Sequence, residues 1–339
     1  MFTAIDLFSG CGGLTTGLKK ARFQVLAGVE IDTATGSVFE LNHPDVHLWK
    51  EDISELTGRR IKSRLNIKSG ELDLLAGCPP CQGFSRVRTL NGGHVITDDR
   101  NELIFEFLRL VRELNPKTVM LENVPGLADD KRIESFEEEL ASMGYFPRHQ
   151  VLDVADFAVP QRRKRLILLA GKHGIIAFAK PALVRKTVRD AIGTLPKAGN
   201  SGDGAHDIPE NRSKKIQRRI ARIPHDGGSR LDLPLSEQLD CHKRCNGFKD
   251  VYGRMAWDDV APTLTTGCFN PSKGRFLHPE ENRNITMREA ALLQSFPKNY
   301  KFPADLGKSV LATQIGNALP PEFVRRHASS VKDYLERQY

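Results

Sequence analysis

The 339 residues carry 50 Lys and Arg against 42 Asp and Glu, which gives a net charge of +8 at pH 7, and 40% of them are hydrophobic. This length and apolar content suit one large α/β domain with a buried core and a smaller second domain. No N-terminal apolar run follows Met1, and no unbroken apolar stretch of about 18 residues occurs, which excludes a secreted or membrane-spanning chain and predicts a cytoplasmic protein.

The positive charge is concentrated in the middle of the chain. Residues 180–250 hold 15 Lys and Arg against 9 Asp and Glu, so six of the eight excess charges lie there. A basic segment of this kind favours a polyanionic partner and indicates where a phosphate backbone would lie.

Short apolar runs alternate with helical patterns over the first 170 residues. Residues 102–111 and 133–143 have helical apolar spacing. This alternation predicts a doubly wound α/β fold with a mixed, mostly parallel sheet. The expected strands are Thr3–Phe8, Gln24–Glu30, Leu72–Ala76, Thr118–Leu121 and Arg165–Ala170.

After Lys180 this alternation ends, and Gly- and Pro-rich text follows at residues 193–209 and 224–228. One basic helical stretch, at residues 211–222, interrupts it. The pattern predicts a second, smaller and loop-rich domain.

Cys81 is placed for attack. It follows Pro79 and Pro80 directly after the third expected strand, and the two prolines restrict the backbone that presents its thiol. The carboxyl ends of parallel strands are also where ligands collect. On this segment alone, a structural turn cysteine, or a redox or metal pair formed by Cys78 and Cys81, is an equally open interpretation.

A glycine loop follows the first strand, and an acidic residue ends the second. Gly10, Gly12 and Gly13 would let the backbone approach a ligand at a helix N-terminus. Glu30, 20 residues after Gly10, can accept hydrogen bonds from two ribose hydroxyls. Thr15 stands where the dinucleotide fingerprint has its third glycine, which disfavours a nicotinamide enzyme.

Five motifs occur in one order along the chain, and together they resemble the DNA (cytosine-5) methyltransferases. The similarity runs from about residue 2 to about residue 330 and is poor near residues 180–258. It implies a Rossmann-like methyltransferase fold that uses S-adenosylmethionine. The motifs are Asp6-Leu7-Phe8-Ser9-Gly10-Cys11-Gly12-Gly13-Leu14, Pro80-Cys81-Gln82, Glu122-Asn123-Val124, Gln161-Arg162-Arg163-Lys164-Arg165 and Gln314-Ile315-Gly316-Asn317.

The resemblance assigns four catalytic residues. A thiolate that adds to C6 of cytosine pushes electron density onto C5, which is otherwise a poor nucleophile, and Cys81 is the expected nucleophile. Glu122 is expected at N3 and the amino group and Arg165 at O2, where negative charge develops. Arg163 is expected to brace the site.

The resemblance also assigns the cofactor site. Glu30 would bind the ribose, Asp52 the adenine amino group, and Asn317 would lie near the methionine carboxylate. The other residues expected to bind S-adenosylmethionine are Phe8, Gly10, Gly12, Gly13, Ile31, Ile53 and Pro79.

Duplex DNA is the expected partner, and the target cytosine must rotate out of the helix to expose its ring. Residues 83–100 read as a loop that closes over the flipped base, with an ordinary flexible connection as the alternative. Thr263 resembles the family residue that contacts a backbone phosphate. The remaining candidate DNA-binding residues are Gln82, Ser85, Lys214, Lys215, Arg218 and Arg219; the last four could instead form the solvated face of a helix.

We therefore expect a catalytic domain of residues 1–178 plus 305–339 and a target-recognition domain of residues 179–304. The protein is expected to act as a monomer, with a cognate restriction enzyme as a candidate partner. No metal is expected, because the spacing of Cys241 and Cys245 relative to Cys78 and Cys81 fits no common zinc motif.

Three other functions remain as alternatives. The tRNA-directed branch of the same family shares the catalytic residues but lacks a sizeable variable region, whereas this chain has a basic stretch of roughly 80 residues there. A catalytically idle DNA-binding module is disfavoured by the intact Cys81, Glu122 and Arg165. An oxidoreductase is disfavoured by Thr15.

Overall fold

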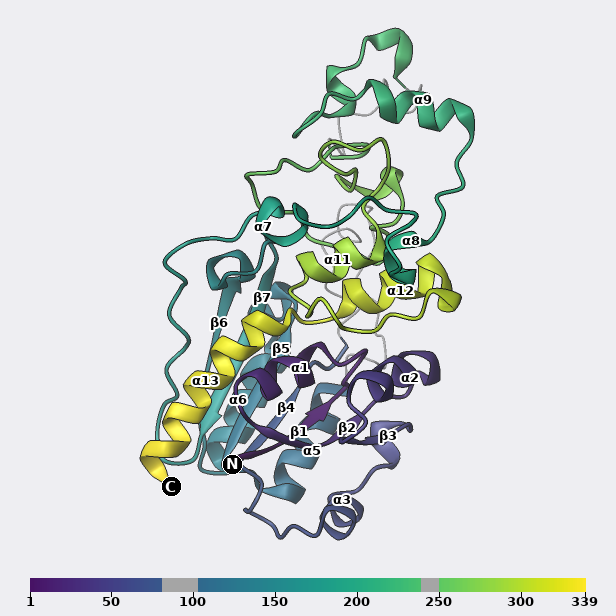
Figure 1. Cartoon of the computed structure of the whole chain (residues 1–339). Coiled ribbons are helices and arrows are strands. Elements are labelled where there is room, and N and C mark those ends of the chain that lie inside the picture. Colours follow the sequence, from purple (N-terminus) through teal and green to yellow (C-terminus); the bar gives the residue numbers. More distant parts are fainter. Residues whose placement is uncertain (81–102, 239–249) are drawn as a thin grey trace. The chain divides into compact units, whose positions relative to one another are not determined.

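The computed structural model describes residues 1–80, 103–238 and 250–339, and they form two compact units (Figure 1). Unit 1 comprises Met1–Phe157, Lys164–Pro181 and Leu319–Tyr339; unit 2 comprises Ala158–Arg163 and Ala182–Ala318. The chain passes from unit 1 to unit 2 after Pro181, whereas the expected domains divide between residues 178 and 179. Residues 158–163 and 305–318, expected in the catalytic domain, belong to unit 2 instead.

Unit 1 contains a seven-stranded sheet with the strand order β3-β2-β1-β4-β5-β7-β6. β7 pairs antiparallel with both of its neighbours, and the other pairs are parallel. The predicted mixed, mostly parallel α/β fold is therefore confirmed. The strands are β1 (Thr3–Leu7), β2 (Gln24–Val29), β3 (His47–Trp49), β4 (Leu74–Gly77), β5 (Thr118–Asn123), β6 (Phe146–Asp153) and β7 (Lys164–Gly171).

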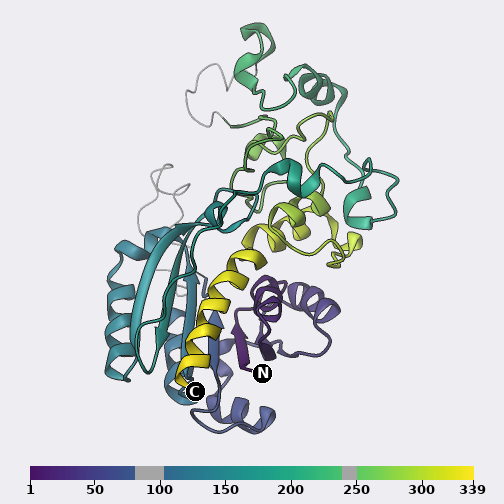
Figure 2. The ribbon, with the colours of Figure 1, turned by 60° about the vertical axis from the view of Figure 1, so that its left-hand side comes forward.

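Helices cover both faces of this sheet. Figure 2 shows α13 along one face and α5 and α6 on the other. In α5, Ile104, Phe107, Leu108 and Val111 recur at helical spacing and are buried against the sheet, which is the amphipathic pattern expected of a covering helix. The helices of unit 1 are α1 (Gly13–Lys20), α2 (Thr33–Asn42), α3 (Gly58–Leu65), α5 (Leu103–Leu114), α6 (Lys131–Ser142) and α13 (Pro321–Gln338).

The first and last helices of unit 1 pack closely. A Cβ atom at Gly17 in α1 would lie 2.3 Å from Cβ of Val324 and 2.6 Å from the carbonyl oxygen of Pro321 in α13. Only glycine permits this approach. At the far end of α13, the Tyr334 hydroxyl accepts a hydrogen bond from the backbone N–H of His173, at 2.6 Å.

Unit 2 is built from short helices and loops. The described β pairings that involve it are isolated bridges, such as the one between Arg254 and Leu277. α11 is buried along its whole length. The helices of unit 2 are α7 (Val188–Ile192), α8 (Gly204–Asp207), α9 (Lys214–Arg222), α11 (Met287–Leu293) and α12 (Gly307–Asn317).

Arg254 joins the loops of unit 2. Its side chain is fully buried, and its guanidinium donates hydrogen bonds to the carbonyl oxygens of Ile220, Ile223, His278 and Glu281 and to Oδ1 of Asn282, at distances between 2.6 and 3.0 Å. One side chain thus satisfies acceptors from two separate segments, residues 220–223 and 278–282.

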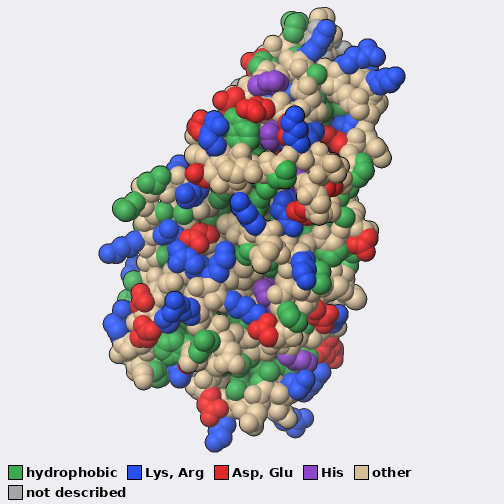
Figure 3. All heavy atoms as spheres, in the orientation of Figure 1, with side chains coloured by type: hydrophobic (Ala, Val, Ile, Leu, Met, Phe, Trp, Pro, Cys, Tyr) green, Lys and Arg blue, Asp and Glu red, His purple; other side chains and the backbone are tan. Residues whose placement is uncertain are grey.

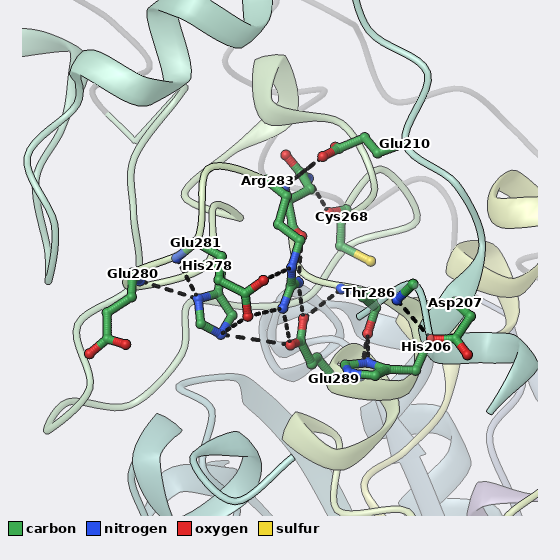
Figure 4. Close-up of polar contacts among 12 residues, drawn as sticks. His206, Asp207, Glu210, Cys268, His278, Glu280, Glu281, Arg283, Thr286 and Glu289 are labelled. Carbon is green, nitrogen blue, oxygen red and sulfur yellow. Dashed lines mark hydrogen bonds and ion pairs between the residues drawn. The ribbon is translucent and has the colours of Figure 1, made fainter. Parts of the chain in front are cut away.

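A second polar cluster lies nearby in unit 2 (Figure 4). Arg283 forms ion pairs with Glu289 at 2.7 Å and with Glu281 at 3.1 Å, and Glu289 also accepts from the backbone N–H of Thr286 at 2.7 Å. Burial lowers the pKa of His278, which lies 3.7 Å from Glu289. The cluster secures the N-terminus of α11.

Candidate active site

The glycine loop lies at the carboxyl end of β1, between β2 and β4 in the sheet. From β1 the chain continues to β2 and β3 on one side, and it then returns to β4 on the other side of β1. Such a reversal of strand order opens a crevice for ligands at the carboxyl ends of the strands. Gly10 and Gly12 have φ angles of 56° and 93°. Gly12 is the N-cap of α1, and a Cβ atom at Gly10 would meet nothing within 4 Å. The loop thus leaves open space beside a helix N-terminus.

Glu30 lies at the end of β2 and is oriented by two backbone donors. Its Oε2 accepts from the N–H of Gly10 at 2.9 Å, and its Oε1 accepts from the N–H of Asp32 at 2.8 Å. Burial raises the pKa of Glu30, and these two hydrogen bonds counteract the rise. Each carboxylate oxygen keeps a second lone pair that can accept from a hydroxyl.

Asp6, within β1, is a fully buried carboxyl group beside this loop. Its Oδ2 accepts from the Thr15 hydroxyl at 2.6 Å, whereas its Oδ1 has no hydrogen-bond partner among the described residues. Burial raises the pKa of Asp6 to about 7. Thr15, which breaks the dinucleotide fingerprint, therefore has a structural role here.

The side chains of Glu122 and Arg165 meet between the neighbouring strands β5 and β7, although the residue paired with Glu122 is Ile167. Nε of Arg165 is 2.7 Å from Oε1 of Glu122, and both side chains are largely buried. Strand β5 runs two residues past its expected end, so that Glu122 lies within the strand. The sheet itself thus brings together these two residues that the sequence predicts at the reacting base.

The strand that leads to Cys81 runs beside them. Gly77 of β4 pairs with Leu121 of β5, so Cys78 lies level with Glu122. The Nδ2 of Asn123 donates to the carbonyl oxygen of Pro79 at 3.0 Å and ties the Cys78-Pro79-Pro80 turn to the end of β5. Cys81, Gln82 and Ser85 lie outside the described residues.

Cys78 differs from a nucleophilic thiol. It is half-buried and hydrogen-bonds to the Glu122 carboxylate, and desolvation, together with the charges of Glu122 and Asp6, raises the pKa of Cys78 well above its usual value. A thiol that stays protonated is neither a strong nucleophile nor a metal ligand. No group of three or more His, Cys, Asp or Glu side chains within residues 1–80, 103–238 and 250–339 could hold a metal ion.

The other residues expected to bind the cofactor differ in their burial and in the unit to which they belong. Phe8 has a φ angle of 60° and packs on the core, and Ile31 is 63% exposed. Asp52 uses Oδ1 to accept from the N–H and hydroxyl of Ser54, and Ile53 is buried in the core. Asn317, the last residue of α12, is exposed and belongs to unit 2.

Arg163 is buried within unit 2, where its Nη1 donates to the carbonyl oxygens of Leu264 at 3.1 Å and Gly316 at 2.8 Å. The Gln161 side chain accepts from the N–H of Leu264 at 2.9 Å and donates to Oε1 of Gln294 at 2.6 Å. These bonds join two of the sequence motifs, at residues 161–165 and 314–317, to residues 261–264.

The basic residues expected to contact DNA lie on α9. Lys214, Lys215 and Arg218 are exposed, and Lys and Arg side chains gather at the end of unit 2 that carries this helix (Figure 3). Arg219 is half-buried, and its guanidinium lies over the Tyr252 ring, 5.8 Å from the centroid. Thr263 is exposed, and its hydroxyl donates to the carbonyl oxygen of Arg162 at 2.8 Å.

Sequence reasoning missed three residues at this site: Asp6, Cys78 and Asn123. A signal existed for Asp6, since an acidic residue inside an otherwise apolar strand predicts a specific partner. The contacts of Cys78 and Asn123 depend on the pairing of β4 with β5, which no local pattern reveals.

The geometry agrees with comparisons to known proteins. The family model for C-5 cytosine-specific DNA methylases matches residues 2–333. Type II methylase M.HgiDII from Herpetosiphon aurantiacus is 39% identical over 98% of this chain and 95% of its own length. Type II methyltransferase M1.HphI from Haemophilus parahaemolyticus is 34% identical over 97% and 86%.

Solved structures show the same fold. A protein encoded within an Escherichia coli prophage, described as a candidate DNA modification methyltransferase, superposes with a TM-score of 0.78 at 26% identity, over 99% of this chain and all of that one. A DNMT2 mutant from Spodoptera frugiperda, at 19% identity, reaches 0.64 over 98% of this chain and all of its own and shows the fold alone. With the family model spanning nearly the whole sequence, the chain belongs to the C-5 cytosine-specific DNA methylases.

Proposed function

We propose that this protein transfers a methyl group from S-adenosylmethionine to C5 of a cytosine flipped out of duplex DNA, through a covalent adduct with Cys81. The observation that carries the proposal is the Glu122–Arg165 pair, 2.7 Å apart on β5 and β7. It lies beside the Cys78-Pro79-Pro80 turn that leads to Cys81.

The residues at the glycine loop fit the methyl donor. Glu30 offers a carboxylate already oriented by Gly10 and Asp32, which suits the two hydroxyls of a ribose. The open space beside Gly10 lets a ligand approach the backbone at the start of α1. S-adenosylmethionine supplies the electrophilic methyl group when bound. Phe8, Gly12, Gly13, Ile31, Asp52, Ile53, Pro79 and Asn317 remain predictions from the family resemblance.

The side chains divide the chemistry on the base. The Cys81 thiolate forms a bond to C6, and the C5–C6 electron pair shifts to C5, which takes the methyl group. Glu122 holds N3 and the amino group, and Arg165 holds O2. Arg165 spends Nε on Glu122 and one Nη1 hydrogen on the carbonyl oxygen of Lys164, so further N–H groups remain for the base. Loss of the C5 proton then expels the thiolate and restores the ring.

Unit 2 is the proposed target-recognition domain, and unit 1 the proposed catalytic domain. Exposed cations on α9 and the positive excess of residues 180–250 support DNA binding by unit 2. Gln82 and Ser85 are proposed to contact DNA beside the flipped base, and Arg163 to brace the site. We further propose a cytoplasmic monomer that can be paired with a cognate restriction enzyme. No helix among the described residues is long and apolar enough to cross a bilayer.

The first test identifies the product. The protein is incubated with duplex DNA, or with tRNA, and with S-adenosylmethionine labelled in the methyl group, and the nucleosides are separated. Label in 5-methylcytosine from DNA is expected. Label in N4-methylcytosine or N6-methyladenine, or in tRNA alone, would refute the proposal, and the last result would establish the tRNA-directed alternative.

The second test traps the adduct. A duplex that carries 5-fluorocytosine at the target cannot lose a proton from C5, so the covalent complex should persist as a shifted band on a denaturing gel. Cys81→Ala should abolish the band, and Cys78→Ala, the matched control, should retain it because that thiol stays protonated. Equal loss in both variants would favour a shared role for the two cysteines.

A further inference from the structure

The glycine that caps α1 cannot hold its own backbone. Gly12 is the N-cap of this helix, its φ angle is 93°, and no side chain among the described residues caps the first turn. A glycine carries no oxygen for the N–H groups at a helix start, and its backbone can take many other conformations. The shape of the loop at Gly12 must therefore be fixed by groups from elsewhere in unit 1.

Thr16 and His43 supply these groups. Thr16, one turn along α1, donates its hydroxyl to the carbonyl oxygen of Gly12 at 2.7 Å, besides the helical hydrogen bond from its N–H at 2.9 Å. The His43 ring hydrogen-bonds to the Gly12 backbone, and its Nε2 lies 3.3 Å from the Thr16 hydroxyl oxygen. Both side chains are buried, so the three residues form one buried polar cluster at the start of α1.

These bonds determine where the His43 ring carries its proton. The Thr16 hydroxyl has a single proton, which it donates to Gly12, so it can only accept from His43. Nε2 of His43 must therefore be the donor. Burial lowers the pKa of His43 to about 4, so the ring is neutral near pH 7 and this is its one N–H group.

Helix α2 holds the His43 ring in place. His43 is the C-cap of α2; its N–H donates to the carbonyl oxygen of Phe39 at 2.8 Å, and the centroids of the two rings are 4.9 Å apart. Phe39 is fully buried against β2, where a Cβ atom at Gly28 would lie 3.0 Å from its ring. The apolar core thus limits the freedom of the imidazole to move away from the loop.

Both ends of α2 restrain the glycine loop. Asp32, the N-cap of α2, donates its N–H to Glu30, and Glu30 accepts from the N–H of Gly10 at 2.9 Å. At the other end of α2, His43 reaches Gly12. The two glycines with positive φ in this loop are therefore fixed by two separate contacts, of which sequence reasoning identified only Glu30.

We propose that His43 is a positioning residue for S-adenosylmethionine: its Nε2–H holds Thr16 and Gly12, and thereby the loop, in the conformation that receives the cofactor. The proposal rests on the proposed function and adds to it a residue that acts through the loop. Without this donor the loop would have to become ordered when the cofactor binds, and that cost weakens binding. The methyl transfer that follows would not be slowed.

The test separates the donor from the shape of the ring. His43→Phe keeps a ring on Phe39 but has no N–H. His43→Gln places an amide N–H₂ near the position of Nε2, whereas the shorter side chain of His43→Asn does not extend that far. Lys19→Gln is the matched control, because it breaks the ion pair with Asp45 between α1 and the turn after α2 without contacting Gly12.

The dissociation constant for S-adenosylmethionine is measured by calorimetry without DNA, and thermal unfolding is followed as a check of folding. The KM values for cofactor and DNA and kcat are measured with a duplex substrate. His43→Phe and His43→Asn should weaken cofactor binding about tenfold, as expected for one lost hydrogen bond, and His43→Gln should recover it to within about threefold. In all variants kcat and the KM for DNA should stay within about twofold of the wild type. Lys19→Gln should bind the cofactor as the wild type does.

A folded His43→Phe with wild-type cofactor affinity would overturn the proposal. Equal weakening in His43→Gln and His43→Phe would also overturn it, because the shape of the ring and not its N–H would then matter. Thr16→Val tests the same cluster from α1: it should weaken cofactor binding as well, and its effect should not add fully to that of His43→Phe. Full additivity would contradict a shared action on Gly12. Failure of the wild-type protein to bind S-adenosylmethionine would instead overturn the proposed function.

Discussion

The two units achieve a fixed shape by different means. In unit 1, strands β4 and β5 are buried along their whole lengths, and one large apolar cluster packs beneath helices α5 and α6. In unit 2 the apolar cluster around Ile220, Tyr252 and Leu277 is small, and the described loops are joined through Arg254 and through the Arg283–Glu289 pair. Unit 1 therefore depends on apolar burial and backbone ladders, and unit 2 on buried cations.

This difference determines which changes of sequence each unit can tolerate. A sheet positions Glu122 and Arg165 through backbone pairing, which tolerates many changes of side chain elsewhere. Loops held by one guanidinium can change sequence freely between its contacts, but they depend on the single residue at the centre. The second arrangement suits the target-recognition role that we propose for unit 2.

Removal of the central cation of unit 2 should have the largest effect on stability. Arg254→Met keeps much of the volume but removes the guanidinium donor from four carbonyl groups, of which, within the described part of the chain, only those of Ile220 and Glu281 keep a backbone donor, at a cost of about 3–5 kcal/mol in the free energy of unfolding. Arg254→Lys should lose most of this as well, because an ammonium group cannot reproduce the planar fork.

The two tryptophans allow each unit to be followed separately. Trp49 lies in β3 of unit 1 and Trp257 in unit 2, and both are buried. In a Trp49→Phe background, Arg254→Met should lower the urea midpoint reported by Trp257; in a Trp257→Phe background, the midpoint reported by Trp49 should move less. Lys298→Met is the exposed control. Equal shifts of both reporters would mean that the units do not unfold independently.

A pH test addresses the apolar core of unit 1. Asp6 has a pKa of about 7 in the folded protein, against 3.8 for the ordinary group, so the folded state binds more protons between these values. Stability should therefore fall as pH rises from about 4 to about 7, by at most about 4 kcal/mol, and the penalty should be complete above pH 7.

Asp6→Asn keeps an acceptor for Thr15 and cannot ionise. Trp49 fluorescence reports the unfolding of unit 1. The free energy of unfolding of Asp6→Asn minus that of the wild type should increase between about pH 4 and about pH 7 and then level off. Parallel curves for the two proteins at all pH values would show that burial does not raise the pKa of Asp6.

A smaller effect is expected where α1 meets α13. Gly17→Ala places a methyl group against Val324 and the Pro321 carbonyl oxygen, and forced separation of the helices should cost about 1–3 kcal/mol. Gly36→Ala in α2, where the neighbours are the flexible ends of Leu48 and Lys50, is the matched control and should be neutral or slightly stabilising. The comparison fails if both substitutions shift the Trp49 midpoint equally.

The basic face of α9 should leave the stability of both units unchanged. Neutralising Lys214, Lys215 and Arg218 should flatten the salt slope of DNA binding by about 2.7 if all three contact phosphates, with cofactor affinity unaltered. Arg219→Gln alone should instead destabilise unit 2, because this side chain packs on Tyr252. An unchanged slope in the triple variant would mean that α9 presents only a solvated face.

Much of unit 1 could be predicted, because its strands are apolar runs. The five expected strands match β1, β2, β4, β5 and β7 to within two residues at each end. β3 and β6 were not predicted, because β3 has only three residues and β6 places polar side chains such as Arg148 and Gln150 along the sheet edge.

The sequence predicted which residues belong to the candidate site, but it did not predict how their side chains contact one another. Spacing after the glycine loop supplied Glu30, and family motifs supplied Glu122 and Arg165. The carboxyl group buried at Asp6 and the thiol of Cys78 beside Glu122 follow from strand register. In unit 2, Arg219 was grouped with its exposed neighbours because helical spacing alone does not show that Tyr252 lies beneath it.

The path of the chain through unit 1 has a consequence for its biosynthesis. Leu319–Tyr339 returns to complete a unit that Met1–Phe157 begins, and α13 packs on α1 about 300 residues earlier in the sequence. On the ribosome, all of unit 2 has been made before α13 can dock. The nascent sheet must therefore wait, with the α13-facing surface of α1 uncovered, while roughly half of the protein is still being translated, and that interval is where aggregation or chaperone binding would compete with folding.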